Sequence, residues 1–265
     1  MGKVKTTIHP DYQNDRNLIS FLDKLCSGLF ENEGKILYNK RNVIKSFDSE
    51  AADTTLKNIV VKRYKRPNII QRIVYSFFRP SKAKRAYHNA TELRKKGIDT
   101  PHEIAFIEKW GNILFRYGYY VSGYDGASPI RDRLIEPQDF DKQMAIDFAH
   151  FAAELHQKGI LHHDLNSTNV LYKEEGNRYH FSVIDINRMK FLPEGTAPSK
   201  KDCFENLTRF TGRMDLYEFV LRNYIEKRGW NVSENIQEAI NVKIRHDEQW
   251  RRRKAFFRKI SFRKK

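Results

Sequence analysis

Along the first half of the chain, after a polar lead-in, apolar positions alternate in short runs and then recur at helical spacing. Runs that alternate between apolar and polar residues, separated by polar turns, predict β-strands. Two longer runs with an apolar stripe predict helices, the first ended by Pro80 and the second by Gly97. The predicted order is strands at 35–38, 43–47 and 58–64, helices at 69–78 and 81–97, and strands at about 102–108 and 113–121.

The second half of the chain has a mostly helical pattern. A polar segment at 122–133 has the composition of a connector between two lobes. A long amphipathic helix is expected at 137–158, then a β-hairpin within 159–191, and helices from Asp202 onward. These patterns predict an α+β protein with an N-terminal lobe at 1–121, a mostly helical C-terminal lobe at 122–248 and a basic, aromatic tail at 249–265.

The charge of the chain is strongly positive and unevenly distributed. The net charge is +16 over 265 residues. Residues 57–96 contain 13 Lys or Arg and a single acid, Glu92, and residues 249–265 contain nine bases and no acid. Such clusters predict an anionic partner, which is a phosphate-bearing small molecule, a nucleic acid or an acidic membrane. A basic face that only contacts solvent is the alternative.

Cysteine content and hydropathy indicate the compartment. Cys26 and Cys203 are far apart and lack metal-binding spacing, which suits a reducing environment. Residues 1–17 lack the apolar core of a signal peptide, and no run of about 18 apolar residues is present. We therefore expect a cytoplasmic protein, in solution or on a membrane surface.

Polar residues in and after the predicted hairpin carry the clearest chemical signal. The segment from His162 to Asn169 fits the pattern H-x-D-x-x-x-x-N of protein-kinase catalytic loops, with Asp164 at its acidic position. Asp185 follows sixteen residues later, inside an apolar run of the buried-strand type. Lys62 ends the third predicted strand, like the strand lysine of kinases.

Phosphoryl transfer needs these residue types because its main demands are positioning and neutralisation of phosphate charge. Asn169 and Asp185 offer oxygen ligands to Mg²⁺, which bridges the phosphates of ATP. Asp164 is placed to orient an acceptor hydroxyl and take its proton, and Lys62 supplies a cation for the non-transferred phosphates. The alternative is structural, with Asp164 as a turn residue and Asp185 at the end of a strand.

The phrases between these motifs narrow the resemblance to one family. They are "VVKRYKRPN", "SFFRPSKAKRAY", "GIDTPHEIAFIE", "LHHDLNSTNVLY" and "VIDINRMKF". Over roughly 31–219 the chain resembles the lipopolysaccharide kinase (Kdo/WaaP) family of Gram-negative bacteria, within the protein-kinase-like superfamily. The resemblance implies a two-lobe, protein-kinase-like fold with a small β-rich N-terminal lobe and a mostly helical C-terminal lobe.

The same resemblance implies an activity and a set of roles. It implies transfer of the ATP γ-phosphate to a sugar hydroxyl in the Kdo or heptose inner core of lipopolysaccharide, by an enzyme that is peripheral on the cytoplasmic face of the inner membrane. Asp164 is then the base, Asn169 and Asp185 are the Mg²⁺ ligands, and Lys62 holds the phosphates.

Two features depart from the protein-kinase pattern. The turn after the first predicted strand has no glycine-rich loop, so the side chains of Lys40 and Arg41 are expected to contact phosphate instead. The glutamate that pairs with the strand lysine is expected near His88, but the only acid on that helix is Glu92. Either Glu92 pairs with Lys62, or the pair is absent.

Several other features have more than one interpretation. His162 is expected to brace the loop, and Arg188 either binds acidic groups of the acceptor or lies on the surface. The apolar face of 69–78 is expected in the core rather than against a membrane. The tail is expected on an anionic membrane, with a disordered or nucleic-acid-binding tail as the alternative. The side chains expected to enter the membrane are Trp250, Phe256, Phe257 and Ile260.

Two other functional classes remain open. One is a kinase with a soluble small-molecule or protein acceptor, although an antibiotic kinase, which binds cationic substrates, is expected to have an acidic acceptor lobe. The other is a non-catalytic module that binds nucleotide or nucleic acid. The joint presence of Lys62, Asp164, Asn169 and Asp185 disfavours the second class.

Overall fold

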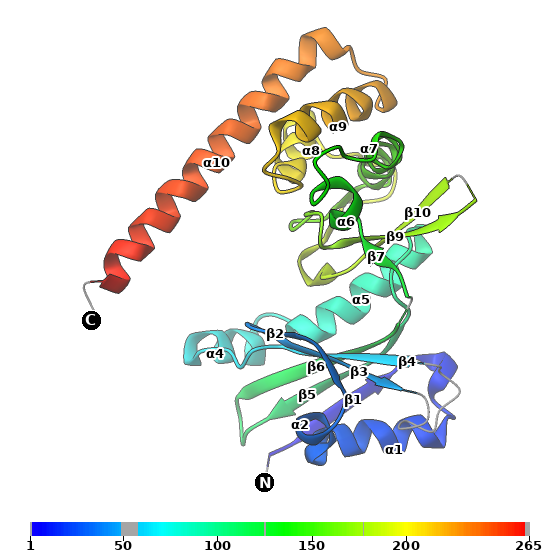
Figure 1. The fold of residues 1–265 in the computed structure, drawn as a ribbon. Coiled ribbons are helices and arrows are strands. Elements are labelled where there is room, and N and C mark those ends of the chain that lie inside the picture. The colour runs from blue at the N-terminus through cyan, green and yellow to red at the C-terminus, as the bar shows by residue number, and fades with distance from the viewer. Residues whose placement is uncertain (1, 49–57, 125, 177, 263–265) are drawn as a thin grey trace. The chain divides into compact units, whose positions relative to one another are not determined.

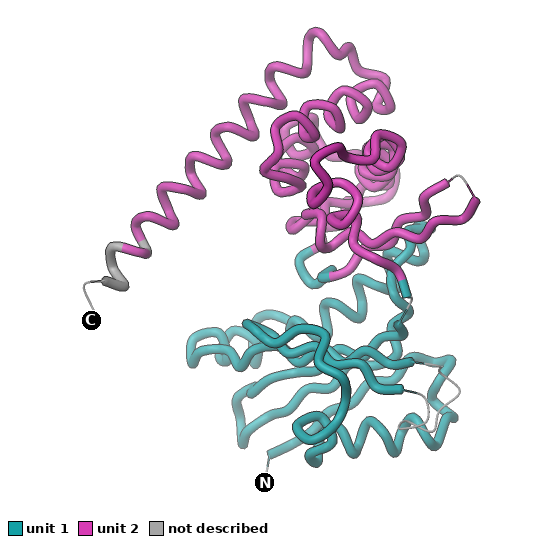
Figure 2. Tube along the Cα trace, viewed as in Figure 1, with its two compact units in different colours: residues 1–126, 185–188 teal, residues 127–184, 189–265 magenta. Residues whose placement is uncertain are grey.

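The computed structural model describes residues 2–48, 58–124, 126–176 and 178–262, without the side chains of 257 and 259–262. The chain divides into two compact units, shown in different colours in Figure 2. Unit 1 is Met1–Gly126 with the short segment Asp185–Arg188, and unit 2 is Ala127–Ile184 with Met189–Lys265. The change of unit therefore falls at 126/127, and 185–188 joins the first unit although the chain around it belongs to the second.

Unit 1 is built on a six-stranded antiparallel sheet in the order β1-β5-β6-β4-β3-β2 (Figure 1). Its strands are β1 (Val4–Ile8), β2 (Lys35–Asn39), β3 (Val43–Asp48), β4 (Asn58–Arg63), β5 (Glu103–Trp110) and β6 (Phe115–Gly123). Its helical segments are η1 (Pro10–Tyr12), α1 (Arg16–Lys24), η2 (Leu25–Leu29), α2 (Phe30–Asn32), α4 (Ile69–Phe77), α5 (Lys82–Lys95) and η3 (Ile186–Arg188). All five strands and both helices predicted for this region are present.

The two faces of the sheet are covered by different helices because side chains alternate along each strand. Ile107 and Val121 are buried in a cluster with Leu18 and Phe21 of α1. Phe106, one position along from Ile107, belongs instead to a cluster with residues of α5. The sheet is thus enclosed on both faces, and α5 lies on the face opposite α1.

The polar lead-in holds structure that the sequence pattern did not predict. It contains β1, which pairs with β5 at the edge of the sheet, and α1, which begins after its N-cap Asp15. The carboxylate of Asp15 accepts a hydrogen bond from the backbone N–H of Leu18 at 2.9 Å. Leu18, Phe21 and Leu22 are buried at helical spacing, a short amphipathic signal within a polar composition.

Helix α4 is the main disagreement with the expected core. None of its nine described residues is buried, and Ile70 is 70% exposed. Phe78, directly after the helix, is 80% exposed. The expectation that this face packs in the core is therefore wrong, and the helix presents a large apolar surface.

Unit 2 is mostly helical, as predicted. Its helices are α6 (Arg131–Leu134), α7 (Lys142–Gln157), α8 (Lys200–Leu207), α9 (Met214–Lys227) and α10 (Val232–Phe262). Its strands are β7 (Ser128–Pro129), β8 (Ile160–Leu161), β9 (Val170–Glu175), β10 (Arg178–Val183) and β11 (Lys190–Phe191). They form the sheets β10-β9-β7 and β11-β8.

The long helix α7 places the catalytic-loop motif. Its N-cap Asp141 accepts a hydrogen bond from the backbone N–H of Met144, and Phe148 stacks on Phe210 in the core with ring centroids 4.4 Å apart. Gly159 ends the helix with φ +73°, and a Cβ there would lie 2.8 Å from the carbonyl oxygen of Thr196. Glycine is therefore required at the turn that leads into β8 and the motif.

Hydropathy along the helices bears on membrane insertion. Among the residues that the structure describes, no helix combines the length and the apolar character that a bilayer-crossing segment needs. The predicted tail from 249 does not form a separate segment, because α10 continues through it to Phe262.

Candidate active site

The catalytic-loop motif lies between β8 and β9 in unit 2, and His162 braces it as expected. The imidazole is 1% exposed. Its Nε2 lies 2.9 Å from the carbonyl oxygen of Ile184, and its Nδ1 accepts the backbone N–H of Asp164 at 3.2 Å. These two contacts are those of a neutral ring with its proton on Nε2. The backbone of Asp164 is thereby fixed relative to the end of β10.

A chain of buried hydrogen bonds connects this loop to helices α7, α8 and α9. Asn206 of α8 donates through Nδ2 to the carbonyl oxygen of His162 at 2.9 Å. Its Oδ1 lies 3.0 Å from Nε2 of His156, whose Nδ1 lies 2.7 Å from the hydroxyl of Tyr224. Burial lowers the pKa of His156 to about 4, so this histidine is neutral at physiological pH.

Asp164 and Asn169 come together within unit 2. The Asn169 amide donates through Nδ2 to the backbone carbonyl of Asp164 at 2.9 Å, which leaves Oδ1 as the atom able to bind a cation. The Asn169 carbonyl oxygen accepts the backbone N–H of Ile184. Carboxylate and amide oxygens of this kind suit Mg²⁺.

Arg209 is a site residue that the sequence did not identify. Its guanidinium lies 3.0 Å from Oδ1 of Asp164. It follows α8 by two residues and is 45 positions from Asp164 in the chain. No local motif connects the two residues, and only the packing of α8 against the loop brings them together. Arg209 therefore orients the predicted base.

The other half of the predicted site lies within unit 1. Nζ of Lys62, at the end of β4, is 2.7 Å from Oδ1 of Asp185. Asn187 donates to the same oxygen at 2.7 Å. The segment is attached to α5 by Asn89, whose Nδ2 donates to the carbonyl oxygen of Ile186 at 2.7 Å. Asn187 was not predicted, and its amide lies next to the carboxylate.

Asp185 has an unusual backbone conformation. Among the described residues it is the one non-glycine residue with a positive φ, at 56°. The left-handed region is sparsely populated by residues with a Cβ, and such conformations concentrate at functional sites. Aspartate tolerates this region better than most side chains. The backbone is thus consistent with a functional carboxylate at this position.

The pair expected between Glu92 and Lys62 is not formed. Glu92 lies 2.9 Å from Lys95, one turn along on the same helix, while Lys62 contacts Asp185. The reason is the register of α5, which buries Ala90 and Leu93 against the sheet and leaves the Glu92 side chain 46% exposed. Asp185 takes the place that a helix glutamate was expected to fill.

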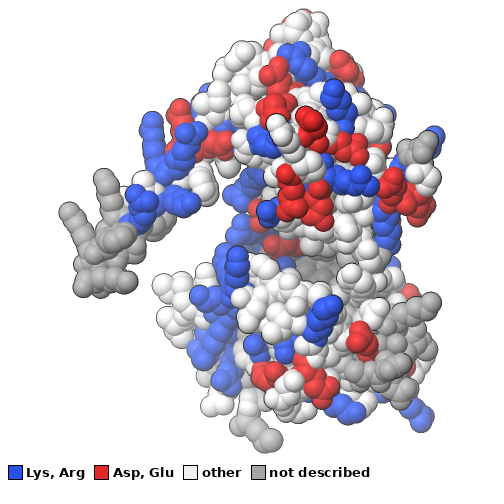
Figure 3. All heavy atoms as spheres, viewed as in Figure 1, with Lys and Arg blue, Asp and Glu red and all other residues white. Residues whose placement is uncertain are grey.

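Bases gather on the side of unit 1 that carries Asp185. Burial, followed by repulsion from Arg41 and Arg188, lowers the pKa of Lys82. The buried Nε of Arg85 has no hydrogen-bond partner among the described residues. Lys40 and Arg41 are exposed in the turn between β2 and β3. Figure 3 shows basic side chains crowded on one side of unit 1. Such crowding suits a highly charged anion.

Sequence and structure comparisons indicate the family and the fold of the chain. The sequence model of the lipopolysaccharide kinase (Kdo/WaaP) family matches residues 35–231. No curated protein matches the chain. Among solved structures, "WaaP in complex with acyl carrier protein" superposes with a TM-score of 0.58 at 13% identity, covering 95% of this chain and 98% of that one.

A second solved structure is a Rio2 kinase–ADP/Mg²⁺–phosphoaspartate complex from Chaetomium thermophilum. It aligns with a TM-score of 0.46 at 15% identity, covering 86% of this chain and 75% of that one. The match to WaaP shows the fold, which is the predicted two-lobe, protein-kinase-like one.

Proposed function

Because the chain belongs to the lipopolysaccharide kinase (Kdo/WaaP) family, we propose that it transfers the γ-phosphate of ATP to a sugar hydroxyl of the Kdo or heptose inner core. The observation that carries this proposal is the braced loop that presents Asp164 and Asn169, with each residue held through its backbone by a hydrogen bond of 3.2 Å or less. A fixed carboxylate and amide at this spacing are what phosphoryl transfer needs from its catalytic loop.

The transfer step assigns one task to each group. Asp164 takes the proton of the acceptor hydroxyl while the hydroxyl oxygen forms a bond to the γ-phosphorus. The bond from that phosphorus to the bridging oxygen breaks, and ADP leaves. Asn169 of unit 2 and Asp185 of unit 1 are the residues that would hold Mg²⁺, which would neutralise phosphate charge. Arg209 keeps the Asp164 carboxylate in place.

Unit 1 supplies charge for the nucleotide. When nucleotide binds, Lys62 would exchange its contact with Asp185 for the non-transferred phosphates. Lys82, Arg85 and Arg41 add further positive charge on the same part of unit 1. This cluster performs the task that a glycine-rich loop performs through backbone amides in protein kinases.

The exposed face of α4 supports action at the cytoplasmic face of the inner membrane. Five large apolar side chains are exposed on or directly after this helix: Ile69, Ile70, Ile73, Phe77 and Phe78. Basic side chains crowd beside this uncharged surface in Figure 3, which is viewed as in Figure 1. An apolar face rimmed by bases binds anionic bilayers by combining insertion with charge attraction. In α10, Trp250 and Phe256 are also exposed, whereas the side chains of Phe257 and Ile260 lie outside the described residues.

A flotation assay with anionic vesicles tests the membrane contact. The double substitution Ile70→Ser and Phe78→Ser is expected to reduce vesicle binding at least fivefold, and raised salt is expected to reduce binding of the unchanged protein. The matched control is Tyr124→Ser, which removes another large exposed side chain of unit 1 at the opposite end of β6 from Phe115, where α4 packs. Equal losses in the double variant and the control would show that α4 is not the contact.

The activity itself is tested with radiolabelled ATP and purified acceptors. Kdo-lipid A and heptosylated core in detergent are compared with a generic protein and with no acceptor. Label is expected in one of the two glycolipids and not in the protein. Labelling of the protein alone would instead identify a kinase with a protein acceptor, and absence of label in every arm would favour a non-catalytic nucleotide-binding module.

A further inference from the structure

Asp164 borders a hollow that lies wholly within unit 2. The cavity has a volume of about 420 Å³, within the range of small-molecule sites. Loop residues form one wall, and α10 forms the other with side chains from three successive turns. The polar and aromatic side chains that matter are Asp164, Arg209, Lys243, His246, Trp250 and Arg251.

The charges of this hollow are unevenly compensated. Nζ of Lys243 lies 2.8 Å from Asp247, which His246 also contacts, so the charge of Lys243 is largely offset by that carboxylate. Arg209 contacts Asp164 but is 46% exposed. Arg251 is exposed, and no ion pair is found for it within the described part of the chain. Two guanidinium groups therefore border the cavity with capacity to bind an anion.

Trp250 adds a flat apolar surface to the same wall. Its side chain is 56% exposed although it borders the cavity. The ammonium of Lys254 lies over the ring, 4.8 Å from its centroid. An aromatic ring next to arginines is suited to a ligand that has both an apolar ring face and negative groups.

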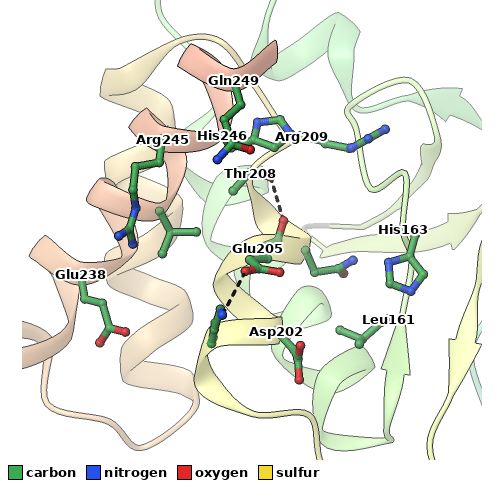
Figure 4. A pocket seen from close by; sticks show the side chains of 13 residues that line it. Leu161, His163, Asp202, Glu205, Thr208, Arg209, Glu238, Arg245, His246 and Gln249 are labelled. Atoms are coloured by element: carbon green, nitrogen blue, oxygen red, sulfur yellow. Dashed lines mark hydrogen bonds and ion pairs between the residues drawn. The ribbon is translucent and has the colours of Figure 1, made fainter. Parts of the chain in front are cut away.

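A second cavity continues the first one along α10. It has a volume of about 580 Å³ and shares Thr208, Arg209 and His246 with the first. Figure 4 shows its side chains, with Arg245 and Glu238 projecting from α10 and His163 facing them from the other side. The two cavities together exceed what one sugar ring needs, so a ligand of more than one ring fits along this helix.

We infer that the hollow beside Asp164 binds the acceptor as an acidic sugar, with Trp250 packed on the ring and Arg251 and Arg209 on its carboxylate or phosphate groups. The inference rests on the proposed function and assigns its acceptor site. A hydroxyl of a ring held there lies next to the carboxylate of Asp164, which must take its proton. The second cavity then holds the neighbouring residue of the oligosaccharide.

The test uses the full-length protein and a water-soluble probe, the deacylated inner-core oligosaccharide. Its phosphates and carboxylates are retained, so membrane binding does not enter the measurement. Trp250→Ala and Arg251→Gln are each expected to raise KM for the oligosaccharide about tenfold, with KM for ATP unchanged. Trp250→Phe keeps an aromatic ring and is expected to recover most of the affinity.

A matched control is available on the same helix. Arg252 is adjacent to Arg251, has the same charge, is 84% exposed and does not border either cavity. Arg252→Gln is therefore expected to leave KM for the oligosaccharide unchanged. An equal effect of the two glutamine substitutions would reduce Arg251 to a general contribution of net charge and overturn its assignment.

Calorimetric binding of the oligosaccharide separates this inference from the proposed function. If the unchanged protein binds the oligosaccharide but transfers no phosphate, and Trp250→Ala loses that binding, the site is supported and the activity is rejected. Transfer by the unchanged protein with the same KM in Trp250→Ala and Arg251→Gln would reject the site and keep the activity. If the unchanged protein does not bind the oligosaccharide, both are rejected.

Discussion

The two halves of the candidate site are held in place by different forces. In unit 2 the catalytic loop is fixed by neutral hydrogen bonds among buried groups, from His156 through Asn206 to His162. In unit 1 the position of Asp185 depends on an ion pair with Lys62 and on a left-handed backbone conformation. The Lys62 side chain is 13% exposed and that of Asp185 is 31% exposed. The first arrangement forms when the unit folds, whereas the second can exchange partners.

This difference matches what each half has to do. A base must be in place before the acceptor arrives, and buried, fully paired hydrogen bonds provide such pre-organisation. In the proposed reaction Asp185 and Lys62 would change partners when nucleotide binds, and a partly exposed ion pair contributes little enough to stability to be broken. The left-handed conformation of Asp185 costs about 1 to 3 kcal/mol, which favours a functional role over a structural one.

The largest effect is expected at Asp164, the proposed base in unit 2. Asp164→Asn keeps the size of the side chain and the backbone hydrogen bonds of the loop but removes the proton acceptor. Turnover is expected to fall about a thousandfold, with nucleotide binding retained, because general base catalysis typically contributes 10² to 10⁴. Steady-state kinetics and calorimetry with ADP measure the two quantities, and Asp147→Asn on the exposed side of α7 is the control. Turnover within tenfold of the unchanged protein would remove Asp164 from this role.

The neutral hydrogen-bond chain predicts a specific dependence of stability on pH. The pKa of His156 is lowered to about 4 in the folded protein from an ordinary value near 6.5. Below pH 6.5 the unfolded chain therefore binds a proton that the folded one excludes, so the free energy of unfolding falls as the pH drops from about 6.5 to about 4. The fall attributable to this group is at most about 3 kcal/mol.

Denaturant unfolding at a series of pH values measures this slope. His156→Gln removes the titrating group and is expected to flatten the curve between pH 4 and 6.5, although the variant is less stable at pH 7. Burial also lowers the pKa of His150 on the same helix, but this side chain is less buried, so the control His150→Gln is expected to keep most of the slope. A slope unchanged by His156→Gln would assign the acid sensitivity to other groups.

A smaller effect is expected at the exchangeable half. Asp185→Asn keeps an oxygen ligand but removes the charge, so turnover is expected to fall about a hundredfold. In contrast to the Asp164 variant, the Mg²⁺-dependent part of nucleotide affinity is also expected to fall, which calorimetry with ADP at two Mg²⁺ concentrations measures. Asp185→Gly separates two properties of this position, because glycine relieves the left-handed strain while it removes the carboxylate that would bind the metal. If the Mg²⁺ dependence of nucleotide affinity were the same in the unchanged protein and in Asp185→Asn, Asp185 would not be the metal ligand.

Much of the fold followed from the sequence because its elements are regular. Strands β2 to β6 have clear alternating apolar runs and helix α7 has a clear apolar stripe, and the structure places them within five residues of the predicted bounds. Helix α1 was missed because its apolar residues are few and set in a polar composition. Helix α4 was assigned to the core because a periodic apolar stripe indicates a buried face without indicating what covers it.

The candidate site could be predicted only where it is encoded locally. Asp164 and Asn169 lie in one short motif, and Lys62 and Asp185 end or interrupt apolar runs, so each has a sequence signal. Arg209 contacts Asp164 only because α8 packs beside the loop, and no spacing rule connects them. Trp250 and Arg251 border the cavity because α10 continues into residues 249–262, where a separate tail was expected.

The smallest effect is expected at Glu92, and it sharpens the contrast between the two halves. In protein kinases a helix glutamate holds the strand lysine, and Glu92 was the one acid of α5 that could do so. In the structure Asp185 holds Lys62, and Glu92 pairs with Lys95 on the exposed side of the helix. An exposed pair of this kind contributes at most about 1 kcal/mol to stability and nothing to the site. Glu92→Gln is therefore expected to change turnover and KM for ATP less than twofold, in steady-state kinetics beside Lys62→Met, which is expected to lower turnover at least tenfold. A loss in Glu92→Gln comparable to that in Lys62→Met would mean that α5 shifts when nucleotide binds, and that the exchange of partners in unit 1 extends from Asp185 to the helix.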